Sequence, residues 1–298
     1  MNITNVGEGK VVLIAGGGKT YTDVAARFCR SQKSLDEIIG SPYNKKIVDA
    51  IVNSRHTAAL EFDWFIFGIE GYSRVTEVQL VRKRHASYLI KSGRAETKGK
   101  RSFDVVLPTD KRLDRVLATT QLDIDQIALT NVETGELVEL ETALRPDYKA
   151  GDDNKWCANI HIDNYQLLSL MESFYNRSVE CGVKEEDARY YKPQATEFKA
   201  LIGMNATALN QWFRIRTCNR AQTEIRDLAT KMMHLCKEAA PDLFQNAGPS
   251  CVETGFCPEG EQCAQCKGKV PTIEQYKKFK NNSRDYENFV KYLTSLDK

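Results

Sequence analysis

A dense cluster of basic residues lies in the first third of the 298-residue chain. Eight lysines and arginines fall between Arg82 and Arg101, where Glu96 is the only acidic residue. Such a run is often a solvated basic face. A more specific function is favoured by the apolar spacing of residues 73–91, which would hold Gln79 and Arg82 on a helix close to the core. Because an arginine near the core requires an anion, the segment predicts an anion-binding site.

The next three residues supply groups that suit phosphate binding. Ser92 has a hydroxyl, Gly93 permits close approach of the backbone, and Arg94 carries a guanidinium fork. Ser92 has only cations as close sequence neighbours and no histidine assigned as its base, so we interpret it as a phosphate donor and not a nucleophile. The Gly-Gly-Gly-Lys-Thr string at 16–20 resembles a phosphate loop, but Leu13 replaces the glycine which that loop needs. A plain strand-to-helix turn is the better interpretation there.

The surrounding pattern indicates which elements position the basic segment. Runs of β-branched and aromatic residues predict strands at 10–15 and 64–69. Apolar residues at three- and four-residue spacing predict a helix over 73–91, ended by Ser92 and Gly93. Further helices are predicted at 25–30, 47–52, 163–181, from 185 onwards, at 205–216 and from Asn219 to Pro241. This order predicts an α+β fold with a central mixed or antiparallel sheet and flanking long helices.

Composition bounds the class of protein. With 42 basic and 40 acidic side chains, the net charge of +2 gives no reason to expect nucleic acid as a partner. No apolar run is long enough to span a membrane, and the N-terminus lacks the pattern of a signal peptide. We therefore expect a soluble, cytoplasmic protein that does not bind membranes.

Four of the nine cysteines crowd into a Gly- and Pro-rich segment near the C-terminus: Cys251, Cys257, Cys263 and Cys266. Four thiolates in such a short segment are able to close a tetrahedral zinc site. An iron-sulfur cluster would use the same ligands, and redox disulfides or no metal are also open. We predict a domain at 1–250, with a charged, hairpin-containing insertion at 97–160, and a Cys-rich extension at 251–298 that ends in a polar helix.

Several motifs together resemble the flavin-dependent thymidylate synthases. The family signature runs Arg-His-Arg, two residues, Ser, one residue, Asn-Glu, one residue, Ser, one residue, Arg-Tyr. The chain has the same spacing in Arg82-Lys-Arg84, Ser87, Leu89-Ile90, Ser92 and Arg94-Ala95. Other matching segments follow in the family's order: Ser54-Arg-His56, Ile69 to Arg74, Glu186 to Arg189, Asn205, and Arg216 followed by Asn219 to Arg226. The resemblance covers residues 9–247 apart from the insertion.

The resemblance implies roles for individual residues. A deoxyuridylate (dUMP) pocket would be lined by Gln79, Arg82, Ser92, Gly93, Arg94, Arg189 and Arg216. Arg216 would contact and polarise the uracil. FAD would be bound by Arg82, Lys83, Arg84, Asn205 and Gln211, with His56 nearby, although His56 is as readily interpreted as a structural residue. Cys218, close to Arg216, is interpreted as a structural thiol.

The resemblance also implies a reaction and an assembly. The implied reaction is the reductive C5-methylation of dUMP to dTMP, in which NADPH is the reductant and methylenetetrahydrofolate is the carbon donor. This reaction uses no enzyme nucleophile. The sites would form between subunits of a homotetramer. Attack on uracil develops negative charge at its O2, N3 or O4, and a fixed arginine such as Arg216 can stabilise that charge.

The signature departs from the family at Lys83, Leu89, Ile90 and Ala95. Ile90 replaces a glutamate, and the loss of a hydrogen-bond acceptor can change which substrate a site accepts. The first alternative is therefore a related enzyme that methylates or hydroxymethylates another pyrimidine nucleotide at C5. The second is a non-catalytic nucleotide- or nucleic-acid-binding protein.

Overall fold

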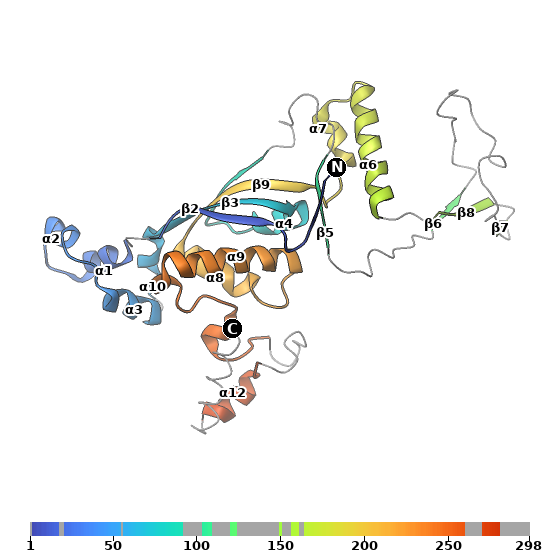
Figure 1. Ribbon diagram of the computed structural model, residues 1–298. Helices are drawn as coiled ribbons and strands as arrows, with labels where there is room; N and C mark the ends of the chain where they lie inside the picture. The colour runs from blue at the N-terminus through green and yellow to red at the C-terminus, as the bar shows by residue number, and fades with distance from the viewer. Residues whose placement is uncertain are drawn as a thin grey trace. The chain divides into compact units, whose positions relative to one another are not determined.

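The computed structural model describes residues 2–17, 21–54, 56–91, 103–108, 120–123, 149–150, 156–160, 164–259 and 270–280. The chain divides into two compact units, one formed by residues 1–108 and 194–298 and the other by residues 109–193. Each unit has its own sheet and helices, shown as a ribbon in Figure 1.

A four-stranded antiparallel sheet forms the centre of the first unit. Its strand order is β2 (Lys10–Ala15), β3 (Trp64–Ser73), β9 (Glu197–Asn205) and β4 (Ser87–Ile90). The long strands β3 and β9 pair along almost their whole length, with Phe67 opposite Ile202. A separate parallel pair joins β1 (Ile3–Asn5) to β5 (Val105–Leu107).

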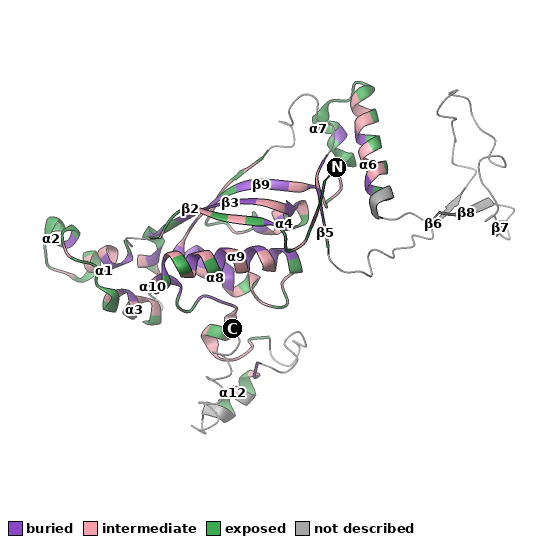
Figure 2. Cartoon of the chain, viewed as in Figure 1, coloured by how far each residue is buried: buried purple, intermediate pink, exposed green. Residues whose placement is uncertain are grey.

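Two helices, α8 (Ala206–Arg216) and α9 (Thr223–Ala239), run below this sheet in Figure 1. Alternate residues of the central strands face the core, where Phe67, Ile202 and Met204 are fully buried. In Figure 2, purple marks buried residues along β3, β9, α8 and α9. Shorter helices complete the unit: α1 (Thr22–Arg30), α2 (Leu35–Ile39), α3 (Lys45–Ser54), η1 (Thr57–Phe62), α4 (Arg74–Leu80), α10 (Pro241–Phe244), α11 (Ser250–Thr254) and α12 (Ile273–Lys280).

Two buried carboxylates connect the helices to the sheet. Glu224 at the start of α9 accepts hydrogen bonds from the backbone N–H and the hydroxyl of Ser73, at 2.6 and 2.5 Å. Asp63 accepts from the backbone N–H groups of Tyr21 and Thr22, at 2.8 and 2.9 Å. Since a buried carboxylate needs such donors, both sites fix where a helix begins relative to β3.

The second unit contains a three-stranded antiparallel sheet and helices. Its strands are β6 (Thr120–Asp123), β8 (Trp156–Ile160) and β7 (Lys149–Ala150), in that order. Its helices are α6 (Asn164–Glu180), α7 (Glu185–Ala188) and η4 (Arg189–Tyr191). The hairpin predicted within the 97–160 insertion, at residues 132–137, lies outside the described residues.

The prediction of one helix over 73–91 is wrong. Helix α4 ends at Leu80, and the chain turns and then forms strand β4, which pairs with β9. The basic residues at 82–85 interrupt the apolar spacing, and the edge of the sheet offers β4 a hydrogen-bonded partner that a sequence window does not show. As a result Arg82 is exposed, and the expectation that it lies near the core is also wrong.

No helix among the residues that the structure describes combines the length and apolar character needed to cross a bilayer.

Candidate active site: a cationic pocket between α4 and α8

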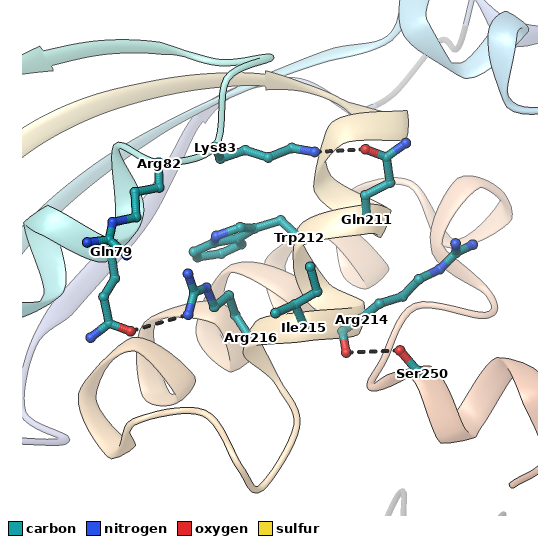
Figure 3. Close-up of a pocket in the computed structure, with 9 residues that line it drawn as sticks. All are labelled: Gln79, Arg82, Lys83, Gln211, Trp212, Arg214, Ile215, Arg216 and Ser250. Atoms are coloured by element: carbon teal, nitrogen blue, oxygen red, sulfur yellow. Dashed lines mark hydrogen bonds between the residues drawn. The ribbon is translucent and has the colours of Figure 1, made fainter. Parts of the chain in front are cut away.

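A pocket of about 450 Å³ opens where the end of α4 faces one side of α8, and we call it the cationic pocket. Figure 3 shows its side chains converging from these two elements and from α11. Its described lining residues are Gln79, Arg82, Lys83, Gln211, Trp212, Arg214, Ile215, Arg216 and Ser250. None of these is acidic, and four are basic, so the pocket favours an anionic ligand of small-molecule size.

Gln79 and Arg216 form the first link across this pocket. Arg216 lies in the last turn of α8, and its Nη1 donates to Oε1 of Gln79 at 3.2 Å. The pKa of the half-buried Arg216 is lowered, first by burial and then by the positive charge of Arg82. A nearby anion would offset both effects, while the guanidinium remains protonated at neutral pH.

Lys83 and Gln211 form the second link. Nζ of Lys83 donates to Oε1 of Gln211 at 2.8 Å. The hydroxyl of Tyr88 on β4 donates to the carbonyl groups of Leu80 and Lys83, at 2.8 and 3.0 Å, and so fixes the turn that carries Arg82 and Lys83. Burial lowers the pKa of Lys83 and raises the pKa of Tyr88 to about 12. The lysine is therefore partly desolvated without a carboxylate partner in the described structure.

The third side of the pocket comes from the segment after α10. Arg214 forms an ion pair with Glu253 of α11, with Nε to Oε2 at 2.6 Å and Nη2 to Oε1 at 2.9 Å. The hydroxyl of Ser250 donates to the carbonyl of Arg214 at 3.4 Å. Because Glu253 neutralises Arg214, the cations that remain for a ligand are Arg82, Lys83 and Arg216.

Trp212 occupies the middle of the pocket. In Figure 3 its indole ring projects from α8 between Arg82 and Arg216. The residue is 3% exposed, and its ring lies 5.9 Å from that of Phe213, measured between centroids. Its Nε1 is buried without a hydrogen-bond partner in the described structure.

The structure places Gln79, Arg82, Lys83, Gln211 and Arg216 around one pocket, whereas the resemblance divides them between the nucleotide and the flavin. Asn205 is placed differently, because its side chain caps α8 by accepting from the N–H of Ala208 at 2.8 Å. Arg84 is exposed and does not line the pocket. Arg189 is exposed in the second unit. Ser92, Gly93 and Arg94 lie outside the described residues.

His56 lines a different cavity of about 630 Å³, which we call the apolar pocket. It is bounded by α1, α3 and η1, and alanine, isoleucine and phenylalanine side chains form most of its wall: Ala25, Ala26, Ile47, Ala50, Ile51, Ala58, Ala59 and Phe62. Arg27, Arg30 and Lys46 add polar groups. Such a wall suits a planar, apolar ligand surface.

The predicted cysteine site is only partly within the described chain. Cys251 and Cys257 are half-buried, whereas Cys263 and Cys266 lie outside the residues that the structure describes. No group of three or more metal-ligating side chains occurs among the described residues. Cys218 is half-buried, and burial in the core strongly raises the pKa of the Cys236 thiol.

Four lining residues were not predicted from the sequence: Trp212, Arg214, Ile215 and Ser250. The α8 residues had a usable signal, since 211, 212, 215 and 216 follow the spacing of one helix face. No signal in the sequence indicated Ser250, because only the fold brings α11 close to α8.

Three comparisons with known proteins bear on this fold and pocket. The model of the family described as thymidylate synthase complementing protein matches residues 15–242. A flavin-dependent thymidylate synthase of Geobacter sulfurreducens is 35% identical over 240 residues, which cover 80% of this chain and 84% of that protein. One from Pyrococcus furiosus is 31% identical over 233 residues, covering 77% of this chain and 78% of that protein.

A solved structure with a similar fold is the UMP/dUMP methylase PolB from Streptomyces cacaoi bound with 5-Br dUMP. It has a TM-score of 0.56 and 17% sequence identity, and the match covers 82% of this chain and 96% of that one. The predicted α+β fold is confirmed. The chain belongs to the thymidylate synthase complementing protein family. It is an enzyme of the flavin-dependent thymidylate synthase-like class, as the signature predicts.

Proposed function

We propose that the chain catalyses the FAD-dependent reductive C5-methylation of dUMP to dTMP, with methylenetetrahydrofolate as carbon donor and NADPH as reductant. One observation carries the proposal. Two segments about 130 residues apart in the sequence place Gln79, Arg82, Lys83, Gln211 and Arg216 around one cationic pocket. The names of the curated relatives support the same activity.

The cationic pocket fits a nucleotide monophosphate. Its volume of about 450 Å³ suits a small ligand, and Arg82 and Lys83 present charged donors that no carboxylate of the described lining neutralises. Guanidinium groups bind phosphate oxygens in pairs, which gives both affinity and orientation. We propose that Ser92, Gly93, Arg94 and Arg189 complete the phosphate and sugar contacts, at sites formed between subunits.

We propose that Arg216 stabilises the pyrimidine when its ring becomes electron-rich. Its Nη1 is held by Gln79, so one edge of the guanidinium is fixed before a ligand binds. Charge that develops on a uracil oxygen would then meet a preorganised cation, and this arrangement is the most effective form of electrostatic catalysis.

We propose that Arg82, Lys83, Arg84, Asn205, Gln211 and His56 bind the FAD. The basic pocket fits the phosphates of the cofactor, and the apolar pocket beside His56 offers the surface that its ring system needs. When bound, the flavin accepts hydride from NADPH and supplies it to the pyrimidine. The protein's own contribution is to hold nucleotide and cofactor in position and to exclude water.

A second candidate function is the methylation or hydroxymethylation of another pyrimidine nucleotide at C5. Ile90 stands where the family signature has a glutamate, and its side chain packs against the core from strand β4. Leu89 beside it is 69% exposed. Neither side chain has a hydrogen-bond acceptor for a base or a sugar hydroxyl. The chain therefore lacks at this position a group that would discriminate dUMP from other pyrimidine nucleotides.

The proposed function is tested by identifying what co-purifies and by measuring turnover. Denaturing the purified protein should release FAD, which mass spectrometry identifies. Product analysis should show that dUMP is converted to dTMP when methylenetetrahydrofolate and NADPH are both present. Turnover of UMP in preference to dUMP would establish the second candidate function. Colourless protein that cannot be reconstituted with FAD would contradict both.

We also propose a homotetramer, because one face of the central sheet is apolar and exposed. The exposed residues are Val12, Ile14, Trp64, Ile66, Leu89 and Leu201. A contiguous apolar surface of this kind is typical of an interface. Light scattering during size-exclusion chromatography should give four times the mass of 33.8 kDa, and a monomeric mass would contradict the proposal.

For the C-terminal extension we propose a structural zinc ion held by Cys251, Cys257, Cys263 and Cys266. The two described thiols fit such a site in that both are half-buried and close in the chain, Cys251 within the short helix α11 and Cys257 just after it. Elemental analysis of protein purified without chelator should find about one zinc per chain. Iron with sulfide would instead indicate a cluster.

A further inference from the structure

The indole N–H of Trp212 is an unusual feature of the cationic pocket. The residue is 3% exposed, and Nε1 has no hydrogen-bond partner within the described structure. A buried indole N–H normally finds an acceptor, because leaving the donor unpaired is costly. Trp212 therefore lines the pocket with an indole N–H that is buried and unpaired within the described structure.

The residues around Trp212 are rich in donors and poor in acceptors. Oε1 of Gln79 already accepts from Arg216, and Oε1 of Gln211 already accepts from Lys83. The other polar side chains of the described lining are cations and the hydroxyl of Ser250, which donates to a backbone carbonyl. None of these side-chain oxygens is a hydrogen-bond partner of the indole Nε1, so a bound ligand can supply the acceptor.

We propose that Nε1–H of Trp212 donates a hydrogen bond to an acceptor oxygen of the phosphate-bearing ligand in the cationic pocket. The proposal rests on the proposed function, and it adds a specificity-determining residue that the signature did not indicate. The ring lies between Arg82 and Arg216 in Figure 3, so an oxygen that reaches the indole is also within the field of two cations. The oxygen belongs either to the pyrimidine nucleotide or to the flavin dinucleotide.

The test removes the N–H and keeps the shape of the ring. The chain has three tryptophans, so in a Trp64→Phe, Trp156→Phe background Trp212 is the only one. Biosynthetic replacement of that tryptophan by benzothienylalanine substitutes sulfur for the N–H at nearly constant volume. Trp212→Phe in the same background is the second variant. Isothermal titration measures Kd for dUMP and for FAD separately, and thermal unfolding reports on stability.

The expected result is a Kd about tenfold higher for one of the two ligands, with the other Kd unchanged, which corresponds to one lost hydrogen bond. The affected ligand identifies the source of the oxygen. Unchanged affinity for both ligands would overturn the proposal and leave the proposed function intact. An equal loss for both ligands together with a lowered Tm would also overturn it, because a purely structural role has that pattern. If the parent protein binds neither ligand, the proposed function itself fails.

Discussion

Four basic side chains line the cationic pocket, whereas alanine, isoleucine and phenylalanine side chains form most of the wall of the apolar pocket. In the apolar pocket Arg27 is committed to the protein, since its guanidinium binds Asp23 at 2.9 Å and the carbonyl of Pro42 at 2.8 Å. In the cationic pocket Arg82 and Lys83 have no carboxylate partner among the described residues, whereas Arg214 is neutralised by Glu253. The apolar pocket therefore offers mainly apolar surface to a ligand, and the cationic pocket offers the unneutralised charge of Arg82 and Lys83.

This difference predicts how the two pockets respond to substitution. Cations without a carboxylate partner interact strongly with an anion, so their removal should cost much of the binding energy. An apolar wall contributes through many small contacts, so a single change there should have a small effect. The largest effects are expected at Arg216 and Arg82, intermediate ones at Lys83, and the smallest at His56.

Replacing Arg216 by alanine should lower kcat/KM for dUMP by about a hundredfold, the typical effect of losing one preorganised donor to developing charge. Arg216→Lys should recover only part of the lost kcat/KM, because a lysine keeps the positive charge but lacks the planar guanidinium fork. The matched control is Arg214→Ala in the same helix, where Glu253 already occupies the guanidinium. Equal losses in Arg216→Ala and Arg214→Ala would show that the two arginines do not differ in role.

Replacing Arg82 by alanine should raise Kd for dUMP by about thirtyfold, as expected for a lost hydrogen bond to a charged group. Arg84→Ala should leave that Kd unchanged, because Arg84 is exposed and lies outside the lining of the cationic pocket. Both variants should weaken FAD binding. Isothermal titration with each ligand separates the two residues. The pocket boundary described above would be wrong if Arg84→Ala weakened dUMP binding as much as Arg82→Ala.

The sequence indicated residues of the cationic pocket better than it predicted the elements that carry them. Five of the lining residues were named by the family resemblance, because motif residues are compared one by one. Strand β4 was assigned to a helix, since a local window does not contain its pairing with β9. Strand β9 was also missed, although Phe198, Ala200, Ile202 and Met204 alternate as a half-buried strand should. Ser250 depended on tertiary packing alone.

Lys83 should make dUMP binding depend on pH. Burial lowers its pKa from the ordinary 10.5, so its ammonium loses the proton at a lower pH than an exposed lysine would. Raising the pH through that lowered pKa should weaken dUMP binding by about fivefold. Lys83→Arg should flatten the profile because a guanidinium stays protonated, whereas Lys83→Gln should bind weakly at every pH.

The lowered pKa of Lys83 should also make the stability of the folded chain depend on pH. Between the lowered pKa and 10.5 the unfolded chain binds more protons at Lys83 than the folded chain, so the contribution of Lys83 to stability rises with pH. In Lys83→Gln this rise should be absent from the free energy of unfolding measured in denaturant. A parent and a variant with the same pH profile would mean that Lys83 is not desolvated.

The smallest effect is expected for His56→Ala. His56 is exposed at the edge of the apolar pocket, and its neighbours there, such as Ala59 and Phe62, remain to hold a ring. Kd for FAD should rise about threefold, as for a partly solvated polar contact, while Kd for dUMP stays constant. His234→Ala is the matched control, because it removes an exposed histidine from α9 outside both pockets. A loss of dUMP affinity in His56→Ala but not in the control would mean that the apolar pocket also binds the nucleotide, and the division between surface and charge would then fail.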